Sequence, residues 1–320
     1  MTMIRNILAA TDFSARSLDA VDRGFDIADR TGARYSVMHA LELDAFAQLR
    51  ELLGARSAIV TEKVVDDARV ALQTILADAA RNRGVSAGLH LEEGRATIAV
   101  QNYADAVNAD LVVLGSHGEG FLQGLLLGST ASRLVRKSRT PVLVVKNPCQ
   151  KNYRRVLVAV DLSPASLTAL RLARQIAPDA EINLLHVYEV PFEAMLHYAS
   201  VDAETIEQYR REALEQAMQR MHMLAKAAQL PVDCYTLQAL KGNAARIILQ
   251  QEIAQDCDLI AIGKHGTHEM EELLLGSVTK HVLEEARADV LVVTDRRMPD
   301  TTAASTTSVS SSATRPKTTG

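Results

Sequence analysis

Short apolar runs and longer stretches with helical spacing alternate along most of the chain. In the first half, runs of Val, Ile, Leu and Ala predict strands near residues 4–11, 34–40, 85–91, 110–115 and 141–146. Between them, the apolar spacing predicts helices near residues 15–31, 58–83, 95–108 and 126–138. The strands are apolar on both faces, which is typical of strands buried between two layers of helices. The pattern therefore predicts an α/β fold with a parallel sheet and right-handed crossovers.

The second half of the chain repeats the first. Four segments recur in the same order, namely 6–14 as 155–163, 110–118 as 258–266, 125–129 as 273–277, and 141–145 as 289–293. A repeat of about 148 residues is as long as a whole domain. We therefore expect two modules at 1–147 and 154–297, joined by a short linker at 148–153. The Ser/Thr-rich segment 298–320 has too few apolar residues to order itself and is expected to be a disordered tail.

Charge and cysteine content narrow the class of protein. The formal net charge is −4, so the chain has no basic excess for holding nucleic acid phosphates. No apolar run approaches the roughly 18 residues that a membrane span needs. Cys149, Cys234 and Cys257 are odd in number and lack CxxC spacing, which indicates a reducing compartment. We expect a cytoplasmic protein that binds neither nucleic acid nor a membrane.

A glycine-rich loop after the fourth strand of each module carries the candidate chemistry. In the first copy, Gly115 and Gly118 are followed after nine residues by Gly128, Ser129 and Thr130 at the start of a helix. The second copy repeats this spacing with Gly263, Gly266, Gly276, Ser277 and Val278. Glycine permits positive φ and close approach of backbone amides to a ligand, and a helix N-terminus suits a phosphate. The serines stand where a hydroxyl could cap the helix or bond a phosphate oxygen.

Other interpretations of the same residues carry less weight. Glycines also mark tight turns that bind nothing. The chain has no GxxxxGK[ST] motif, and the glycines at 118, 120 and 124 follow the fourth strand rather than the first, which argues against a dinucleotide site. His265 and His268 have a spacing that a metal could use, but no compact ligand set accompanies them. We therefore predict no catalytic residue and no metal site.

The loop spacing, the Thr11–Ser14 segment and the closing Pro141–Val145 strand resemble the universal stress protein family. The resemblance covers about residues 3–147 and 153–295, and two modules in one chain look like its tandem (UspE-type) members. It implies two Rossmann-like modules of the adenine nucleotide alpha hydrolase-like kind, each a five-stranded parallel sheet flanked by helices. It also implies dimer-like packing of the two modules through their last strands, and it leaves open a further homodimer.

The resemblance further implies that ATP, with Mg²⁺, binds across the strand ends. The residues that match the family's site are Asp12, Ala40, Gly115, Gly118, Gly128, Ser129 and Thr130 in the first copy. In the second copy they are Asp161, Val187, Gly263, Gly266, Gly276, Ser277 and Val278. The acidic residue would lie beside the nucleotide, and Ala40 or Val187 would contact adenine.

Departures from the family pattern predict two unequal sites. Glu119 and Thr267 stand where members often have Lys or Arg after the second loop glycine, and Val278 lacks the hydroxyl of Thr130. A carboxylate near a triphosphate is repulsive unless a divalent cation intervenes or the side chain points outward. We therefore expect the affinities of the two copies to differ.

These features predict an ATP-binding stress-response protein whose nucleotide-dependent conformation acts on a protein partner that the sequence does not name. Two alternatives stay open. One is a slow Mg²⁺-dependent ATPase in which Asp12 or Asp161 would position water. The other is a non-catalytic scaffold in which the loops are empty and the packing of the modules is the purpose.

Overall fold

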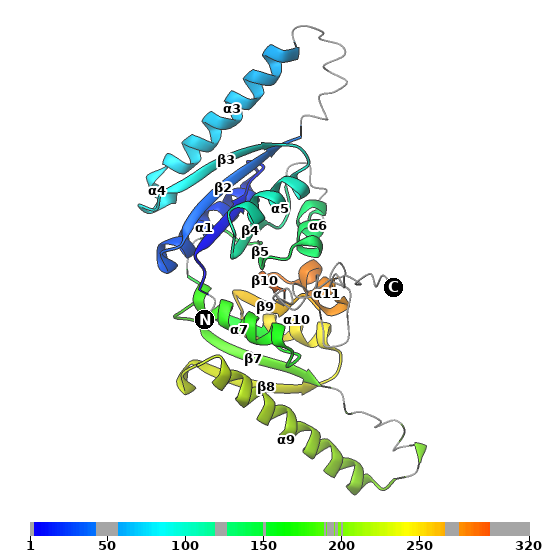
Figure 1. Ribbon diagram of the computed structural model, residues 1–320. Coiled ribbons are helices and arrows are strands. Elements are labelled where there is room, and N and C mark those ends of the chain that lie inside the picture. Colours follow the sequence, from blue (N-terminus) through cyan, green and yellow to red (C-terminus); the bar gives the residue numbers. More distant parts are fainter. Residues whose placement is uncertain are drawn as a thin grey trace, which may run out of the picture.

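The structure is a computed structural model that describes residues 3–42, 57–118, 127–149, 152–188, 190, 195, 198–199, 201–265 and 275–294. Its two halves, called module one and module two below, each contribute five strands to one sheet (Figure 1). The strands of module one are β1 (Asn6–Ala10), β2 (Arg34–Leu41), β3 (Ala87–Glu93), β4 (Leu111–Gly115) and β5 (Val142–Val145). Those of module two are β6 (Arg155–Ala159), β7 (Glu181–Tyr188), β8 (Tyr235–Lys241), β9 (Leu259–Gly263) and β10 (Asp289–Val293).

The ten strands run in the order β3-β2-β1-β4-β5-β10-β9-β6-β7-β8. All pairs within each module are parallel. Between the modules, β5 and β10 pair antiparallel, with Leu143 opposite Leu291. The strand order is therefore the same when counted outward from this central pair in either direction. The predicted α/β class, with two modules that each contain a five-stranded parallel sheet, is confirmed.

Helices cover both faces of the sheet. Module one contributes α1 (Ala15–Thr31), α3 (Ser57–Ala77), α4 (Ala79–Asn82), α5 (Ala96–Ala106) and α6 (Ser129–Lys137). Module two contributes α7 (Pro164–Ile176), α9 (Ala203–Ala227), the 3-10 helix η3 (Val232–Cys234), α10 (Ala244–Ala254) and α11 (Ser277–Glu285). Residues of α1, α3, α7 and α9 share one apolar core cluster, and residues of α5, α6, α10 and α11 share another. The sheet is therefore buried on both sides, which explains its nearly continuous apolar strands.

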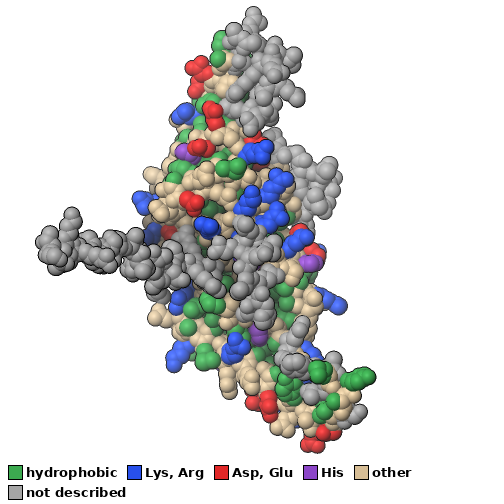
Figure 2. Space-filling view, turned by 45° about the vertical axis from the view of Figure 1, so that its right-hand side comes forward, with side chains coloured by type: hydrophobic (Ala, Val, Ile, Leu, Met, Phe, Trp, Pro, Cys, Tyr) green, Lys and Arg blue, Asp and Glu red, His purple; other side chains and the backbone are tan. Residues whose placement is uncertain are grey.

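The long helices α3 and α9 lie at opposite ends of the molecule (Figure 1). The helix expected at 58–83 is divided at Asp78, whose side chain accepts a hydrogen bond from the Ala80 amide at 2.9 Å and caps α4. Charged side chains of both signs occupy the described part of the face shown in Figure 2. Among the described helices, none is both long and apolar enough to cross a membrane.

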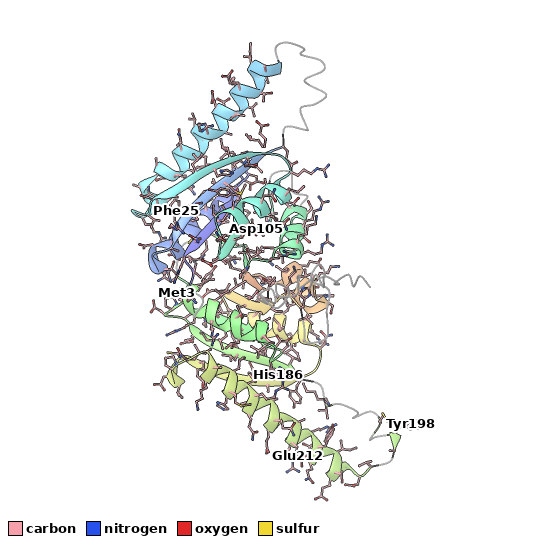
Figure 3. All side chains as sticks on the ribbon, in the orientation of Figure 1. Met3, Phe25, Asp105, His186, Tyr198 and Glu212 are labelled. Atoms are coloured by element: carbon pink, nitrogen blue, oxygen red, sulfur yellow. The ribbon has the colours of Figure 1, made fainter. Side chains whose placement is uncertain are left out.

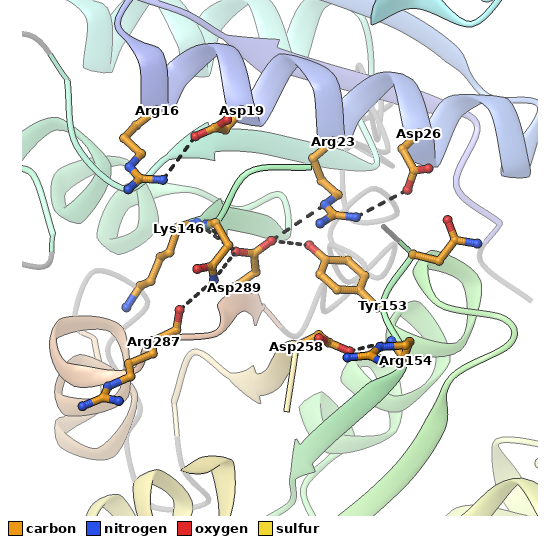
Figure 4. Close-up of polar contacts among 12 residues, drawn as sticks. Arg16, Asp19, Arg23, Asp26, Lys146, Tyr153, Arg154, Asp258, Arg287 and Asp289 are labelled. Atoms are coloured by element: carbon orange, nitrogen blue, oxygen red, sulfur yellow. Dashed lines mark hydrogen bonds and ion pairs between the residues drawn. The ribbon is translucent and has the colours of Figure 1, made fainter. Parts of the chain in front are cut away.

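The seam between the modules is built around Asp289, which begins β10 and is 1% exposed (Figure 4). One oxygen of its carboxylate accepts the backbone amides of Lys146 at 2.8 Å and Asn147 at 3.2 Å. The other oxygen accepts the Tyr153 hydroxyl at 2.6 Å. Burial raises the pKa of Asp289, and these donors oppose that effect. Because Lys146, Asn147 and Tyr153 flank the connection between the modules, Asp289 anchors that connection to the edge of module two.

Arg23 brings helix α1 into the same seam. Its guanidinium is 4% exposed, lies 4.0 Å from the centre of the Tyr153 ring, and has its Nε 3.8 Å from Asp289. It also lies 3.5 Å from Asp26, which is in turn paired with Arg30 at 2.9 Å. The seam thus combines a strand pairing with a buried network of charges. Such networks are strongly destabilised when one member is removed, because the rest stay buried without their partner.

We predict that Tyr153→Phe lowers the free energy of unfolding by about 1–3 kcal/mol, because the buried Asp289 carboxylate loses a hydrogen bond. Urea denaturation followed by circular dichroism would measure the change. Tyr103→Phe is the control, since the Tyr103 ring is half-buried and stacks on His90 with ring centroids 3.7 Å apart. We expect that variant to stay within about 0.5 kcal/mol of the parent. Equal losses in both variants would contradict the role given to the Tyr153 hydroxyl.

Candidate functional site

An acidic residue follows the first strand of each module and supports the start of the next helix. Asp12 Oδ1 accepts the Ser14 amide at 3.1 Å and the Ser14 hydroxyl at 2.5 Å. Asp161 Oδ1 accepts the Ser163 amide at 3.0 Å and the Ser166 hydroxyl at 2.7 Å. Ser14 and Ser163 are the N-caps of α1 and α7. One carboxylate oxygen in each module is therefore used to hold the turn.

A histidine near the end of the second strand ties that strand to the first. His39 Nδ1 lies 2.8 Å from the Thr11 carbonyl oxygen, and His186 Nδ1 lies 2.7 Å from the Val160 carbonyl oxygen. A carbonyl oxygen only accepts hydrogen bonds, so Nδ1 carries the proton in both rings. Figure 3 shows His186 near the end of β7. The sequence analysis gave these histidines no such role, although their recurrence at equivalent positions of the two copies was a signal for one.

The loop glycines are required for close packing. The expectation of positive φ was wrong for Gly115, Gly118, Gly128, Gly263 and Gly276, since the positive-φ glycines of the described chain lie elsewhere. A Cβ at Gly115 would lie 2.7 Å from the carbonyl oxygen of Arg16. A Cβ at Gly118 would lie 2.0 Å from Asp12 Oδ2. The missing side chain thus lets the loop after β4 pack against the first turn of α1 and against the Asp12 carboxylate.

Helices α6 and α11 begin directly after the loop. Gly128 and Gly276 are their N-caps, and neither helix has a side-chain cap hydrogen bond. Of the two roles that the sequence left open for Ser129 and Ser277, capping the helix is therefore excluded, and bonding to a phosphate oxygen stays a prediction. Both serines are the first helical residues and are exposed. The first amides of each helix consequently face the loop without a capping side chain, and this is the arrangement that binds anions.

In module two, these elements enclose a cavity of about 250 Å³ at the carboxyl ends of the strands. Apolar side chains of β7, α10 and β9 line much of it, namely Leu185, Val187, Ala244, Ile248 and Ile262. Its polar lining comes from Asp161, His265, Ser277 and Thr279, and the backbones of Gly263 and Gly276 also line it. Val278 also lines the cavity. The site thus has an apolar part beside the sheet and an anion-binding part at the start of α11.

Asp161 places an unsatisfied polar atom in this cavity. Its Oδ2 is buried, and it has no hydrogen-bond partner among the described residues. A buried acceptor without a donor costs about 1–3 kcal/mol, and more when it is charged. A ligand that brings a hydrogen-bond donor or a cation to Oδ2 would recover that cost.

Module one arranges the same elements differently. Gly118 packs directly against Asp12 Oδ2, whereas its counterpart Gly266 lies outside the described residues and Asp161 Oδ2 has no hydrogen-bond partner among them. The Phe13 ring lies against the His39 ring, with centroids 4.4 Å apart and the planes tilted by 40°. Module two has Leu162 at the position equivalent to Phe13. Partial burial and the nearby Arg16 guanidinium lower the pKa of His117 in this loop, and the Asp12 carboxylate acts in the opposite direction.

The structure therefore brings most of the sequence-derived site residues together. In module two, six of them line the cavity, namely Asp161, Val187, Gly263, Gly276, Ser277 and Val278. Gly266, Thr267 and His268 lie outside the described residues, as does Glu119 in module one. In module one, four of the predicted residues meet at the strand ends, namely Asp12, Gly115, Gly118 and Gly128. Ser129 and Thr130 are exposed at the start of α6. Ala40 lies in β2 opposite Glu92. Sequence reasoning missed Leu185, Ile248 and Thr279, which come from elements that only the fold brings to the cavity.

The architecture and the paired loops define a protein made of two Rossmann-like α/β modules in tandem. The sequence model described as the Universal stress protein family matches residues 3–146 and 152–294, which is most of the chain. The chain therefore belongs to the universal stress protein family and is a tandem, two-domain member of it.

Individual relatives agree with this assignment. A universal stress protein of Mycobacterium tuberculosis (strain H37Rv) is 28% identical over 186 residues, which are 57% of this chain and 58% of that protein. Universal stress protein A homolog 2 of Coxiella burnetii is 34% identical over 148 residues, which are 44% of this chain and 95% of that protein. The chain thus spans only 58% of the length of the mycobacterial relative.

Solved structures share the fold. A universal stress protein from Archaeoglobus fulgidus matches with a TM-score of 0.63 at 20% identity, over 90% of this chain and 97% of that chain. A putative universal stress protein from Pseudomonas aeruginosa matches with a TM-score of 0.61 at 17% identity, over 91% of this chain and 93% of that chain. Both comparisons cover two modules, so the tandem arrangement is itself shared.

We predict that Gly115→Ala destabilises the protein by about 1–3 kcal/mol, because the new methyl group would overlap the backbone of Arg16. Gly263→Ala is the matched control, since its Cβ would meet Ala165 Cβ at 3.3 Å and the His265 oxygen at 3.4 Å. We expect that variant to lose less than about 1 kcal/mol. Thermal unfolding of the two variants would compare them, and a larger loss for Gly263→Ala would contradict the packing role assigned to Gly115.

Proposed function

We propose that this chain is an ATP-binding universal stress protein whose principal nucleotide site, with Mg²⁺ as counter-ion, is the cavity of module two. The buried Asp161 Oδ2 in that cavity carries the proposal, because it needs a hydrogen-bond donor or a cation. The uncapped start of α11 in the same cavity favours an anion. A nucleotide brings both, through its ribose hydroxyls and its phosphates.

The walls of the cavity support an adenine base as the remaining part of the ligand. Leu185, Val187 and Ile248 give the cavity an apolar surface beside the polar end. Small-molecule sites commonly combine apolar walls with a few placed polar groups. Family membership supports the same ligand class, since the resemblance implies ATP at these strand ends.

We propose module one as the weaker site. The support is the position of Gly118 against Asp12 Oδ2, which leaves that oxygen covered by the loop. Glu119 follows Gly118 in the sequence, and a carboxylate there would repel a triphosphate. About one ATP per chain is therefore expected at concentrations that saturate module two.

The proposed output is regulatory. Nucleotide binding would alter the loop and α11, and a protein partner would respond to that change as part of a cytoplasmic stress response. Family membership supports this role. The cavity supports binding of a ligand and gives no support of its own to hydrolysis.

We predict that Ser277→Glu abolishes high-affinity ATP binding, because it places a carboxylate at the first residue of α11, where the phosphates would lie. An acidic residue at a helix N-terminus stabilises the helix, so the variant is expected to fold. Ser129→Glu is the matched control, since Ser129 is the exposed first residue of α6 in module one. Isothermal titration with ATP and Mg²⁺ would give the stoichiometry and affinity of each variant.

The expected result is about one ATP per chain for the parent and for Ser129→Glu, and none for Ser277→Glu over the same concentrations. A loss of ATP binding in Ser129→Glu but not in Ser277→Glu would indicate that the nucleotide site lies in module one. The proposed function would be contradicted if the parent protein binds no ATP and releases no nucleotide on denaturation.

A further inference from the structure

Two buried lysines reach across the seam between the modules. Lys146 directly follows β5 and is 9% exposed, and Lys264 directly follows β9 and is 2% exposed. The positions equivalent to them in the other module hold Thr294 and Ser116. The two lysines therefore make the seam unequal, although the strand order around it is symmetric.

Lys146, from module one, holds the C-terminal end of α11 in module two. Its ammonium donates hydrogen bonds to the carbonyl oxygens of Leu283 at 2.8 Å and Ala286 at 2.5 Å. The last carbonyls of a helix lack intrahelical partners, and a cation there interacts favourably with the helix dipole. The other end of the same helix, at Gly276 and Ser277, lines the cavity. Lys146 thus fixes the helix whose start forms the phosphate end of the site.

Lys264 ties the segment directly after β9 to module one. It follows Gly263, which lines the cavity, and its carbonyl oxygen accepts the Gly276 amide at 2.9 Å. Its ammonium donates to the carbonyl oxygen of Ser138 at 3.1 Å, and Ser138 is the residue that ends α6 of module one. Lys264, which lies between the cavity-lining Gly263 and His265, and helix α11 are therefore both anchored to module one.

Stability alone does not account for a lysine at position 146. Burial lowers the pKa of Lys146 from 10.5 to about 8, although Glu252 and Asp289 nearby act in the opposite direction. An apolar side chain of similar length could fill the same space without the cost of desolvating a charge. What the ammonium adds is a fixed connection between module one and the end of α11.

We propose that Lys146 and Lys264 are positioning residues through which module one holds the nucleotide site of module two in its binding geometry. This inference rests on the proposed function of that site. Its consequence is that affinity for ATP in module two depends on side chains at the seam that the nucleotide does not touch.

The test is titration of the full-length chain with ATP and Mg²⁺ at pH 7. Lys146→Met is expected to weaken binding about fivefold or more, the size of a favourable helix-terminus interaction. Lys264→Met tests the second anchor independently, and we expect the same direction. Thr294→Val is the matched control. Thr294 occupies the position of module two that is equivalent to Lys146, and its hydroxyl donates to the Arg139 carbonyl oxygen of module one at 2.7 Å. This variant should leave ATP affinity unchanged.

A pH series separates positioning by the charged ammonium from a general packing effect. Because the pKa of Lys146 is about 8, raising the pH from 7 to about 9.5 removes its charge in the folded protein. The parent should therefore lose affinity over this range, whereas Lys146→Met should stay nearly constant, and the two should converge. The charged and titratable groups around Lys146 are Glu252 on α10 and Asp289 on β10, with Arg23 and Tyr153 beyond Asp289. The variant keeps all four, so comparison with it removes their contributions.

The outcomes are distinct. ATP binding by Lys146→Met and Lys264→Met as tight as by the parent would overturn the inference and leave the proposed function standing. Parallel pH profiles for the parent and Lys146→Met would also overturn it, because a packing effect does not titrate. If the parent binds no ATP, the proposed function fails and the inference fails with it. If Lys146→Met does not fold, Lys264→Met and the profile of the parent decide.

Discussion

The antiparallel pairing of β5 with β10 is the constraint on which the rest of the molecule depends. Each module ends its sheet at that strand, and an unpaired apolar edge would be open to association with other chains. Pairing the two edges satisfies their backbone groups and brings charged residues of both modules into a buried space. Asp289 makes this arrangement possible, because its carboxylate accepts the donors of Lys146, Asn147 and Tyr153 where the chain passes from one module to the next.

The same pairing places the two candidate sites in different surroundings. Lys146 and Lys264 both support elements of the module-two cavity, whereas Thr294 and Ser116 stand at the equivalent positions. Module two also has a cavity with a buried, unsatisfied Asp161 oxygen, and in module one the loop packs on the corresponding oxygen of Asp12. Duplication produced two similar modules, and a few substitutions at the seam and in the loops then made them chemically unequal.

Several features of the site could be predicted from the sequence because they lie directly after the ends of predicted strands. The repeat located β4 and β9 and the helices after them, so the glycines, the acidic residues and the helix N-termini were correctly expected at one edge of the sheet. The conformation of the loop was predicted less accurately. The described glycines of the loop lack positive φ, and Gly115 and Gly118 have no room for a side chain because Arg16 and Asp12 approach them. Ser129 and Ser277 lie one residue inside the helices, which excludes capping, one of the two roles that the sequence left open. Such contacts depend on neighbours that are distant in sequence.

The sequence by itself determined the family, the duplication, the parallel sheet of each module and the position of the loops, because these follow from periodicity and spacing along the chain. The tertiary structure decided which residues distant in sequence line the module-two cavity, which histidine in each module joins the first two strands, and which partners Lys146 and Lys264 have. The physical reason is that burial and hydrogen bonding are properties of a location in three dimensions. In the sequence, Lys146 is a lysine that follows a strand, and nothing marks its role. In the fold, its ammonium contacts the end of α11, 137 residues further along the chain.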